Sequence, residues 1–575
     1  MKRGCHFLVL IVGLLATSSF GLTAEVNKAG SGGAFTTIQA AIDSGATDIV
    51  ITDSGRYEEN LQIGDPVTGG PAVTLRSTRT GPQRPVITPA AYKAYSDVHR
   101  TDHAFAFGVF SNGSVLKNLI IEGAPELGVG ALYVMADNVL IENCLFRPER
   151  SWFGTISFPN SLVFFAQQAD VGGSGIPTPG GRNCDGSIMR DCEIVGVPPG
   201  EVLDPVDDFL LGYLMSNKVD GTAMVRMDHF TNGEVVDITF ERCYFHHCRD
   251  AALFPSNRGN NPGQLNITVK SCRFDAFGKF AVRGRGANLT VSHTIFSRTN
   301  QGNHGDSENS AVAIQTQNAH VPNGTVTDCI FVDGGSAYGK RAYYGGVNNH
   351  NGGLLTVDHC TFVGCLSGAG VGTGGGTAQT QTVVSNCIFH QIGYNSQRSV
   401  DATGVTLDAH ADLDNNALYA AWSFGLANFE ANHIWAGVFN NYNTPADGAP
   451  SIVVNNCLVG EIASEDTRPW ADVVAGGLTE KANVLGARLS CGYEGADKGV
   501  RGLETVIRGT PVFVNQDLWA TTPFALAANS PGAGLGARII QPLGMDSEGD
   551  GDVDINDFAV FQLCFNGASR PPACP

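Results

Sequence analysis

One short phrase returns along this chain: an apolar residue, two polar residues, Cys, any residue, and then Phe. Its first full copy is IENCLF at 141–146, and Thr294 takes the Cys place in one later copy. The phrase is centred on Cys144, Cys192, Cys243, Cys272, Cys329, Cys360, Cys387 and Cys457. Counting Thr294, successive copies lie 48, 51, 29, 22, 35, 31, 27 and 70 residues apart. Self-similarity at this period predicts a solenoid, with one turn for each short interval and two or more turns for each long one.

The segments around the phrase are typical of strands rather than helices. They are short, rich in β-branched residues and bounded by Gly, Asn, Asp and Ser. A second family of strands follows several copies, at 251–254, 280–283 and 311–314. In a stack of parallel strands, equivalent positions of neighbouring coils lie about 4.8 Å apart. A residue type that repeats in register therefore forms a ladder up the interior.

The N-terminal part of the mature chain is expected to cover one end of this stack. Ile38 to Ile42 has helical spacing, 48–51 (DIVI) predicts a strand, and 55–59 (GRYEE) predicts a turn. The segment resembles the opening of the right-handed parallel β-helix families, which include pectin methylesterases and pectate-lyase-like secreted proteins. The resemblance implies an all-β, right-handed, single-stranded parallel β-helix over 25–540 with a short N-terminal capping helix. Residues 523–532 resemble the closing coil of such proteins.

The column of cysteines permits a metal, redox or structural interpretation. Cys243-x4-Cys248, with His246 and His247 between the two cysteines, invites a zinc site. Against this, the cysteines alternate with polar residues and accompany Phe, as inward strand residues do, and a buried thiol behaves as a small apolar group. Stacked Cβ vectors are also parallel, which disfavours disulfides. We expect a structural column, and a disulfide only between Cys564 and Cys574 in the tail.

Targeting and charge limit the setting and the partners. Residues 1–24 combine a basic start, an apolar run and small residues, which predicts a signal peptide and a secreted, extracellular or cell-surface protein. No later stretch is apolar for about 18 residues, so no transmembrane segment is expected. The net charge of −19 disfavours nucleic acid and anionic membranes as partners. An acidic polysaccharide would require a local basic groove.

Residues 541–575 form a different unit, a small loop-helix tail. Residues 546–557 (DSEGDGDVDIND) place acidic side chains at loop positions 1, 3, 5, 7, 9 and 12, with Gly551 at position 6, as in an EF-hand loop. An amphipathic helix over 558–565 is expected to follow. The tail resembles one half of a type I dockerin, which implies Ca²⁺ and a cohesin-like or cell-envelope partner. The expected ligands are Asp546, Glu548, Asp550 and Asp557, with the carbonyl of Asp552 and Asp554 through water.

A catalytic centre is harder to find in the sequence. Sites on related β-helices lie on the outer face of one sheet and its flanking loops, and lyases of acidic sugars need a cation and a Lys or Arg base. The expected catalytic residues are Arg226, Arg249, Lys279 and Arg283, and the expected substrate-binding residues are Asp228, His247, Asp250 and Arg285. These residues fall on neighbouring coils, so a shared groove is geometrically possible. Solvated loop charges remain the competing interpretation.

The motifs of individual enzyme families are incomplete. The Gly-x-x-Asp-Phe-x-x-Gly phrase of pectin methylesterases is absent, and Asp207-Asp208 lacks the Gly-His-Gly and Arg-x-Lys partners of polygalacturonases. The sequence therefore favours a carbohydrate-directed β-helix, with a polysaccharide lyase acting on a uronate polymer as the leading hypothesis. The alternative is a non-catalytic surface protein that binds glycans or serves in adhesion.

The acidic loop gives the first testable prediction. Ca²⁺ titration followed by calorimetry should show one binding site, because six acidic side chains in twelve residues repel one another unless a cation gathers them. Asp546→Ala removes the first ligand and should weaken that binding. A titration without heat would contradict the Ca²⁺ assignment.

Overall fold

The computed structural model describes residues 22–539 with gaps. The residues outside the description are 1–21, 92, 96–102, 125–128, 150–160, 169–180, 197–222, 230–232, 249–250, 259–262, 278–279, 300–309, 335–345, 366–368, 372–379, 393–436, 442–450, 463–464, 466, 468–487, 493–498, 521 and 540–575. The predicted signal peptide and the Ca²⁺ loop therefore lie outside the described residues, as does the predicted Cys564–Cys574 disulfide.

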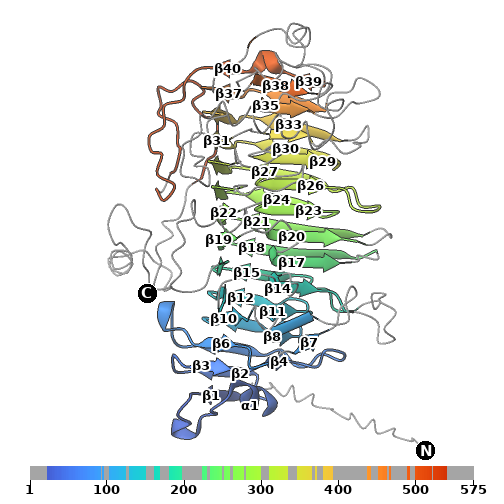
Figure 1. Ribbon diagram of the computed structural model, residues 1–575, viewed down its shortest axis with the longest axis vertical. Coiled ribbons are helices and arrows are strands. Elements are labelled where there is room, and N and C mark those ends of the chain that lie inside the picture. Colours follow the sequence, from blue (N-terminus) through green and yellow to red (C-terminus); the bar gives the residue numbers. More distant parts are fainter. Residues whose placement is uncertain are drawn as a thin grey trace, which may run out of the picture.

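The chain winds into a right-handed parallel β-helix, as the sequence predicts. Each coil contributes one strand in turn to three long parallel sheets, here called A, B and C, and the coils stack along the long axis of the molecule (Figure 1). Within the described residues, no helix is long and apolar enough to cross a bilayer.

Sheet A runs the whole length of the stack. Its strands are, in spatial order, β1 (Thr23–Val26), β2 (Asp48–Ile51), β5 (Thr74–Ser77), β9 (Val115–Lys117), β12 (Leu140–Glu142), β15 (Ser187–Arg190), β18 (Val235–Glu241), β21 (Gln264–Lys270), β24 (Asn288–Ser292), β27 (Gly324–Thr327), β30 (Leu354–Asp358), β33 (Gln381–Ser385), β36 (Ile452–Asn455) and β39 (Val500–Arg501).

Sheet B follows sheet A in every coil. Its strands are β3 (Arg56–Glu58), β6 (Val86–Thr88), β10 (Ile120–Gly123), β13 (Leu145–Pro148), β16 (Glu193–Val195), β19 (Tyr244–Cys248), β22 (Arg273–Phe277), β25 (Ile295–Ser297), β28 (Ile330–Val332), β31 (Thr361–Val363), β34 (Ile388–His390), β37 (Leu458–Val459) and β40 (Ile507–Arg508).

Sheet C completes each coil. Its strands are β4 (Leu61–Ile63), β8 (His103–Val109), β11 (Gly130–Val134), β14 (Ser161–Ala166), β17 (Ala223–His229), β20 (Ala251–Asn257), β23 (Val282–Arg285), β26 (Val312–Gln315), β29 (Val347–His350), β32 (Ala369–Val371), β35 (Gly437–Asn441) and β38 (Arg488–Gly492), with β7 (Ala94–Tyr95) antiparallel to β8.

The recurring phrase marks the corner between sheets A and B. Its first polar residue ends the sheet A strand, and its second has a left-handed backbone with φ between 48° and 58°. Asn and Asp adopt this conformation at lower cost than other non-glycine residues, which explains why they fill most of these positions. The positions are Asn118, Asn143, Asp191, Arg242, Ser271, His293, Asp328, His359, Asn386 and Asn456.

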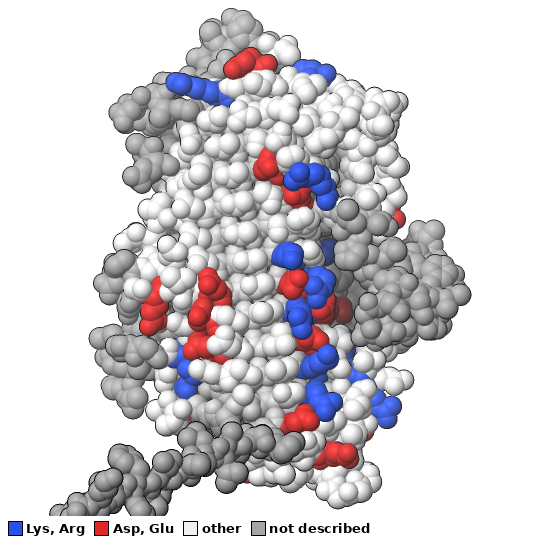
Figure 2. All heavy atoms as spheres, turned by 180° about the vertical axis from the view of Figure 1, so that it is seen from behind, with Lys and Arg blue, Asp and Glu red and all other residues white. Residues whose placement is uncertain are grey.

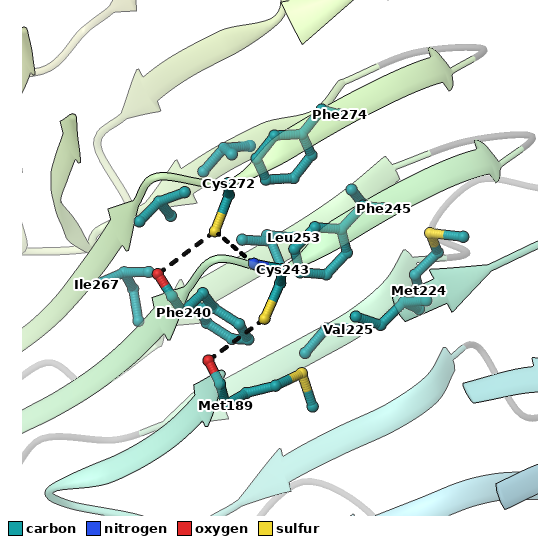
Figure 3. Packing of buried hydrophobic residues seen from close by; sticks show 14 of the residues in the cluster. Met189, Met224, Val225, Phe240, Cys243, Phe245, Leu253, Ile267, Cys272 and Phe274 are labelled. Atoms are coloured by element: carbon teal, nitrogen blue, oxygen red, sulfur yellow. Dashed lines mark hydrogen bonds between the residues drawn. The ribbon is translucent and has the colours of Figure 1, made fainter. Parts of the chain in front are cut away.

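A cysteine follows eight of these corners, where it points into the core and its thiol caps backbone carbonyls, whereas Leu119 and Thr294 follow the other two. The eight sulfur atoms lie 3.1–3.5 Å from the carbonyl oxygen two residues earlier. They also approach a carbonyl of the preceding coil, as Cys243 and Cys272 do toward Met189 and Phe240 (Figure 3). Thr294 fills the same place, with its hydroxyl donating to Ser292 at 2.8 Å. The described cysteines are buried and free, which confirms the structural interpretation of the column.

The phenylalanine of the phrase builds a second interior column beside the thiols. Consecutive rings are 4.6–5.0 Å apart with planes within 9° of parallel, close to the spacing of parallel strands. The stacked rings belong to Phe245, Phe274, Phe296, Phe331, Phe362 and Phe389. Repetition of one shape in register therefore fills the core without a change of packing from coil to coil.

The long intervals between copies of the phrase are single coils, and the prediction of extra turns is wrong. Strands β33 and β36 are neighbours in sheet A although their phrases lie 70 residues apart. The additional chain lies in the connections on either side of sheet C, as between β16 and β17, between β34 and β35, and between β14 and β15. Most connections between sheets A and B hold only the two residues of the left-handed corner, and the longer ones, 52–55, 78–85 and 502–506, lie near the two ends of the stack.

The N-terminal end is covered as predicted, with one correction. Helix α1 (Ile38–Asp43) buries Ile38 and Ala41, and the Glu59 carboxylate accepts hydrogen bonds from the backbone N–H groups of residues 38 and 39. The segment predicted as a turn at 55–59 instead contains β3, because Tyr57 is fully buried between two exposed neighbours. Short 3₁₀ turns occupy Ser31–Gly33, Gly81–Gln83 and Leu503–Thr505.

The C-terminal segment is not the closing coil that the resemblance implies. Residues 511–539, here called the strap, leave β40 and return over the outer face of sheet B (Figure 1). Phe524 and Ile539 pack on Ile295 and Ile330 of that face, and Arg538 forms an ion pair with Asp328 at 2.8 Å. The segment is too irregular and too rich in Gly and Pro to add a further coil, so it buries an apolar strip instead.

The thiol column yields a prediction on stability. Cys243→Thr should change the free energy of unfolding by about 1 kcal/mol or less, because Thr294 already occupies an equivalent slot with its hydroxyl bonded. Cys243→Leu should cost about 1–3 kcal/mol, because the slot has no room for two more carbon atoms. Thermal unfolding followed by circular dichroism measures both, with Thr294→Cys as the matched control. Equal stability of the Thr and Leu variants would contradict a tightly filled column.

Candidate active site on sheet C

The structure brings four of the predicted site residues to the outer face of sheet C. Arg226 and Asp228 lie on β17, and Arg283 and Arg285 lie on β23, with β20 between the two strands. Three further predicted residues, Arg249, Asp250 and Lys279, belong to the connections that precede β20 and β23 and lie outside the described residues.

His247 is not part of this face, contrary to the prediction. It lies at the end of β19 in sheet B with a left-handed backbone, φ 53°. Its Nδ1 is 2.8 Å from Nδ1 of His246. Burial and the neighbouring His246 lower the pKa of His247 to about 4. The sequence placed His247 beside Arg249 and Asp250 in the chain, but the corner after sheet B turns it to a different side.

The aromatic ring of Phe254 is the centre of the cluster. Phe254 on β20 is opposite Arg226 in register, and the guanidinium carbons of Arg226, Arg283 and Arg285 lie 6.0, 5.8 and 5.9 Å from its ring centroid. These distances are within the range of cation–π attraction. Small and aromatic residues of the same face, with Phe280 among them, pack around Phe254. The result is an apolar patch around Phe254 with three guanidinium groups at its edge, here called the pad.

The charges on this face are unequal. Arg226 holds the Asp228 carboxylate at 2.8 Å, and Arg258 approaches the same oxygen at 3.7 Å. Arg283 donates to Oε1 of Gln315 at 2.6 Å. Among the described residues of the cluster, four guanidinium groups therefore face one carboxylate in a chain whose net charge is −19.

Two polar residues that the sequence did not indicate complete the face. His350 on β29 is in register with Gln315, which is in register with Arg285. Burial, together with the charges of Arg283 and Arg285, lowers the pKa of His350 to about 4, so its imidazole is neutral at pH 7. Asn348, on the same strand, is fully buried, and neither polar atom of its amide has a hydrogen-bond partner. An orphaned buried amide costs about 1–3 kcal/mol and marks a place where a ligand can supply the missing bonds.

Charged side chains on the outer face of sheet A are paired with one another among the described residues. On the outer face of sheet A, Lys117 and Arg190 both pair with Glu142, at 2.6 and 2.5 Å. Figure 2 shows that acidic and basic side chains are likewise interspersed on the back of the molecule. Throughout the described part of the chain, no group of three or more His, Cys, Asp or Glu side chains is arranged to hold a metal ion. The predicted Ca²⁺ ligands in the tail lie outside that part.

Comparison with known proteins shows no family for this chain. No protein-family model matches the chain, and no curated protein does. Similar solved structures include a pectin methylesterase from Aspergillus niger (16% identity, 54% of this chain and 84% of that chain, TM-score 0.29). A pectate lyase is also similar (11% identity, 68% of this chain and 86% of that chain, TM-score 0.28). An alginate lyase of polysaccharide lyase family 6 is similar as well (8% identity, 92% of this chain and 58% of that chain, TM-score 0.34). Likenesses of this level support no argument about activity.

The two histidines predict how stability depends on pH. The ordinary pKa of His is 6.5, and the folded chain holds His350 and His247 near 4. Between these values the unfolded chain binds protons that the folded chain does not, so stability is present above pH 6.5 and decreases as the pH falls toward 4. Each histidine should therefore lower the free energy of unfolding by about 2 kcal/mol when the pH falls from 7 to 5.

Chemical denaturation at pH 7 and pH 5 measures this loss. His350→Asn should reduce the difference between the free energies of unfolding at pH 7 and at pH 5. Addition of His247→Asn in a double variant should reduce this difference further. If His350→Asn leaves the difference as large as in the unmodified chain, the imidazole is not held neutral on sheet C.

Proposed function

We propose that this chain binds an acidic polysaccharide across the outer face of sheet C. The observation that carries the proposal is the group of three guanidinium carbons within 6.0 Å of the Phe254 centroid. Arg recognises carboxylates through a planar pair of donors, and an aromatic ring offers a surface to the apolar side of a sugar. The orphaned amide of Asn348 on the same face can bond a sugar hydroxyl as donor and as acceptor.

The reaction that this site would support is β-elimination from a uronate polymer. In that reaction a base removes the proton on C5, a C4–C5 double bond forms, and the bond from C4 to the glycosidic oxygen breaks, with that oxygen taking a proton from water to become a hydroxyl group. Arg283 and Arg285 would stabilise the charge that develops on the uronate carboxylate. His350 is neutral and can accept a proton, and a bound carboxylate would offset the arginine charges and raise its pKa. Lys279 and Arg249 remain proposed bases outside the described residues.

The alternative is a non-catalytic protein for glycan binding or adhesion, which would use the same surface without bond cleavage. Incubation with polygalacturonate and with alginate separates the two hypotheses. A lyase releases an unsaturated product that absorbs ultraviolet light, and His350→Asn should then lower kcat with little effect on KM. Binding of the polymers without any such product would favour the alternative.

We also propose that the chain is exported and that its tail binds Ca²⁺ and a partner of the cohesin or cell-envelope type. The support is the apolar N-terminal segment and the spacing of the acidic residues in 546–557. Attachment through the tail would leave the long faces of the β-helix accessible to a polymer.

Arg283 provides the test of the binding site. Arg283→Ala should lower the affinity for polygalacturonate about tenfold or more, because a charge-assisted hydrogen bond contributes about 1.5–3 kcal/mol. Arg283→Lys should give an intermediate affinity, since it keeps the charge and loses the planar pair of donors. Isothermal calorimetry measures each variant.

Arg76→Ala is the matched control. Arg76 is an exposed arginine on sheet A that pairs with Asp48 at 2.9 Å, so its removal alters the net charge equally at a different face. An equal loss of affinity in both variants would show a nonspecific charge effect, and no loss in either would remove sheet C as the binding face.

A further inference from the structure

The strap presents an exposed tryptophan over sheet B. Trp519 is 58% exposed at the tip of the strap. The guanidinium carbon of Arg273 lies 3.3 Å from the ring centroid, and Arg273 also donates to the carbonyl of Leu518 at 2.6 Å. Burial lowers the pKa of Arg273 to about 10, so the group beneath the ring stays charged at pH 7. One face of the indole is thus fixed on a cation, and the exposure belongs to the rest of the ring.

A second aromatic residue stands beside this ring. Tyr244 lies edge-on to Trp519, with centroids 6.1 Å apart and planes at 83°. In the register of sheet B, Tyr244 lies between Arg273 and Glu193. Coils are spaced by about 4.8 Å, so Trp519, Tyr244 and Glu193 form a row along the axis of the stack.

A carboxylate at the end of the row is held in one orientation. Glu193 is 43% exposed, and its Oε1 lies 3.0 Å from Nε2 of His246, whose ring stacks on Tyr244 at 4.1 Å. A carboxylate accepts, so Nε2 carries the proton and Nδ1 of His246 accepts from Nδ1 of His247 at 2.8 Å. The histidine pair therefore orients Glu193 and leaves carboxylate lone pairs for another donor.

The tryptophan is not needed to hold the strap. Phe524 and Ile539 bury their side chains against the apolar strip of sheet B, and Arg538 pairs with Asp328. Backbone hydrogen bonds close the strap on itself, as from the N–H of Val514 to the carbonyl of Ala525 and from the N–H of Ala527 to the carbonyl of Val512. A large apolar ring that stays exposed at the tip of an already anchored segment indicates a contact surface.

We propose that Trp519, Tyr244 and Glu193 form a second carbohydrate subsite, for neutral sugar residues, on the outer face of sheet B. A pyranose presents an apolar face of C–H groups that stacks on the indole, and hydroxyl groups that donate to the carboxylate. Asp517, which accepts from the backbone N–H of Trp519, adds a second carboxylate near the ring, and arginines, among them Arg273, lie around both carboxylates. The subsite deepens the proposed function, because a polymer with acidic and neutral residues would engage two faces of one molecule.

The test uses the full chain and three neutral probes: cellohexaose, xylohexaose and mannohexaose. Calorimetry and tryptophan fluorescence should detect binding of at least one hexaose. Trp519→Ala should lower that affinity about tenfold or more, and Trp519→Phe should lower it less, because a smaller ring still stacks. Glu193→Gln should weaken binding while the thermal midpoint changes little. Failure of all three probes, or unchanged affinity in Trp519→Ala, would overturn the subsite.

A cross-comparison separates this subsite from sheet C. Arg283→Ala should leave the affinity of the full chain for the hexaose unchanged. Trp519→Ala should leave the affinity of the full chain for polygalacturonate unchanged. If polygalacturonate does not bind the unmodified chain, the proposed function fails and the hexaose result still decides the subsite. If Trp519→Ala lowers the thermal midpoint and both affinities alike, the residue is a structural anchor and the subsite is wrong.

Discussion

The structure depends on the hydrogen-bonded register between coils, which the corner between sheets A and B fixes. In ten coils the corner sets one residue in the left-handed region and directs the next side chain inward, where a thiol, the hydroxyl of Thr294 or the side chain of Leu119 lies. A shift of one residue would turn every inward side chain outward. The stacked rings from Phe245 to Phe389 repeat the same constraint two positions later. Most of these corners therefore stay two residues long, and the longest added segments lie on either side of sheet C.

That constraint accounts for where function can lie. Between sheets B and C the chain adds segments of many residues, as between His390 and Gly437, and sheet C is the face that those connections enter. Its outer surface carries Arg226, Arg283 and Arg285 around Phe254, beside the unsatisfied amide of Asn348. Natural cores satisfy most of their polar groups, so a buried amide without partners beside this cluster is one of the observations on which the proposed binding face rests. Sheet A, by contrast, neutralises its charges in pairs.

The sequence could predict the fold because the fold repeats, and it could predict only part of the site because the site does not. The phrase around Cys243 and its equivalents predicted the solenoid and the inward column, and the N-terminal segment with its helical spacing at 38–42 predicted the β-helix family and the capping helix. The predicted number of turns was wrong because an interval of 70 residues does not show whether the added chain forms further coils or lengthens a connection. Arg226 and Arg283 were found as a basic cluster, whereas His350 reaches the same face only through the register of sheet C. His247 was misplaced because a corner separates it from its neighbours in the chain.

The central claim is that sheet C holds an acidic sugar between its arginines. A crystal structure of the chain with a uronate oligosaccharide tests it most directly. The account predicts a carboxylate within hydrogen-bond distance of Arg283 and Arg285, a sugar ring against Phe254 and a bonded amide at Asn348. An oligosaccharide bound only on sheet A or sheet B, with the amide of Asn348 still unpaired, would contradict it.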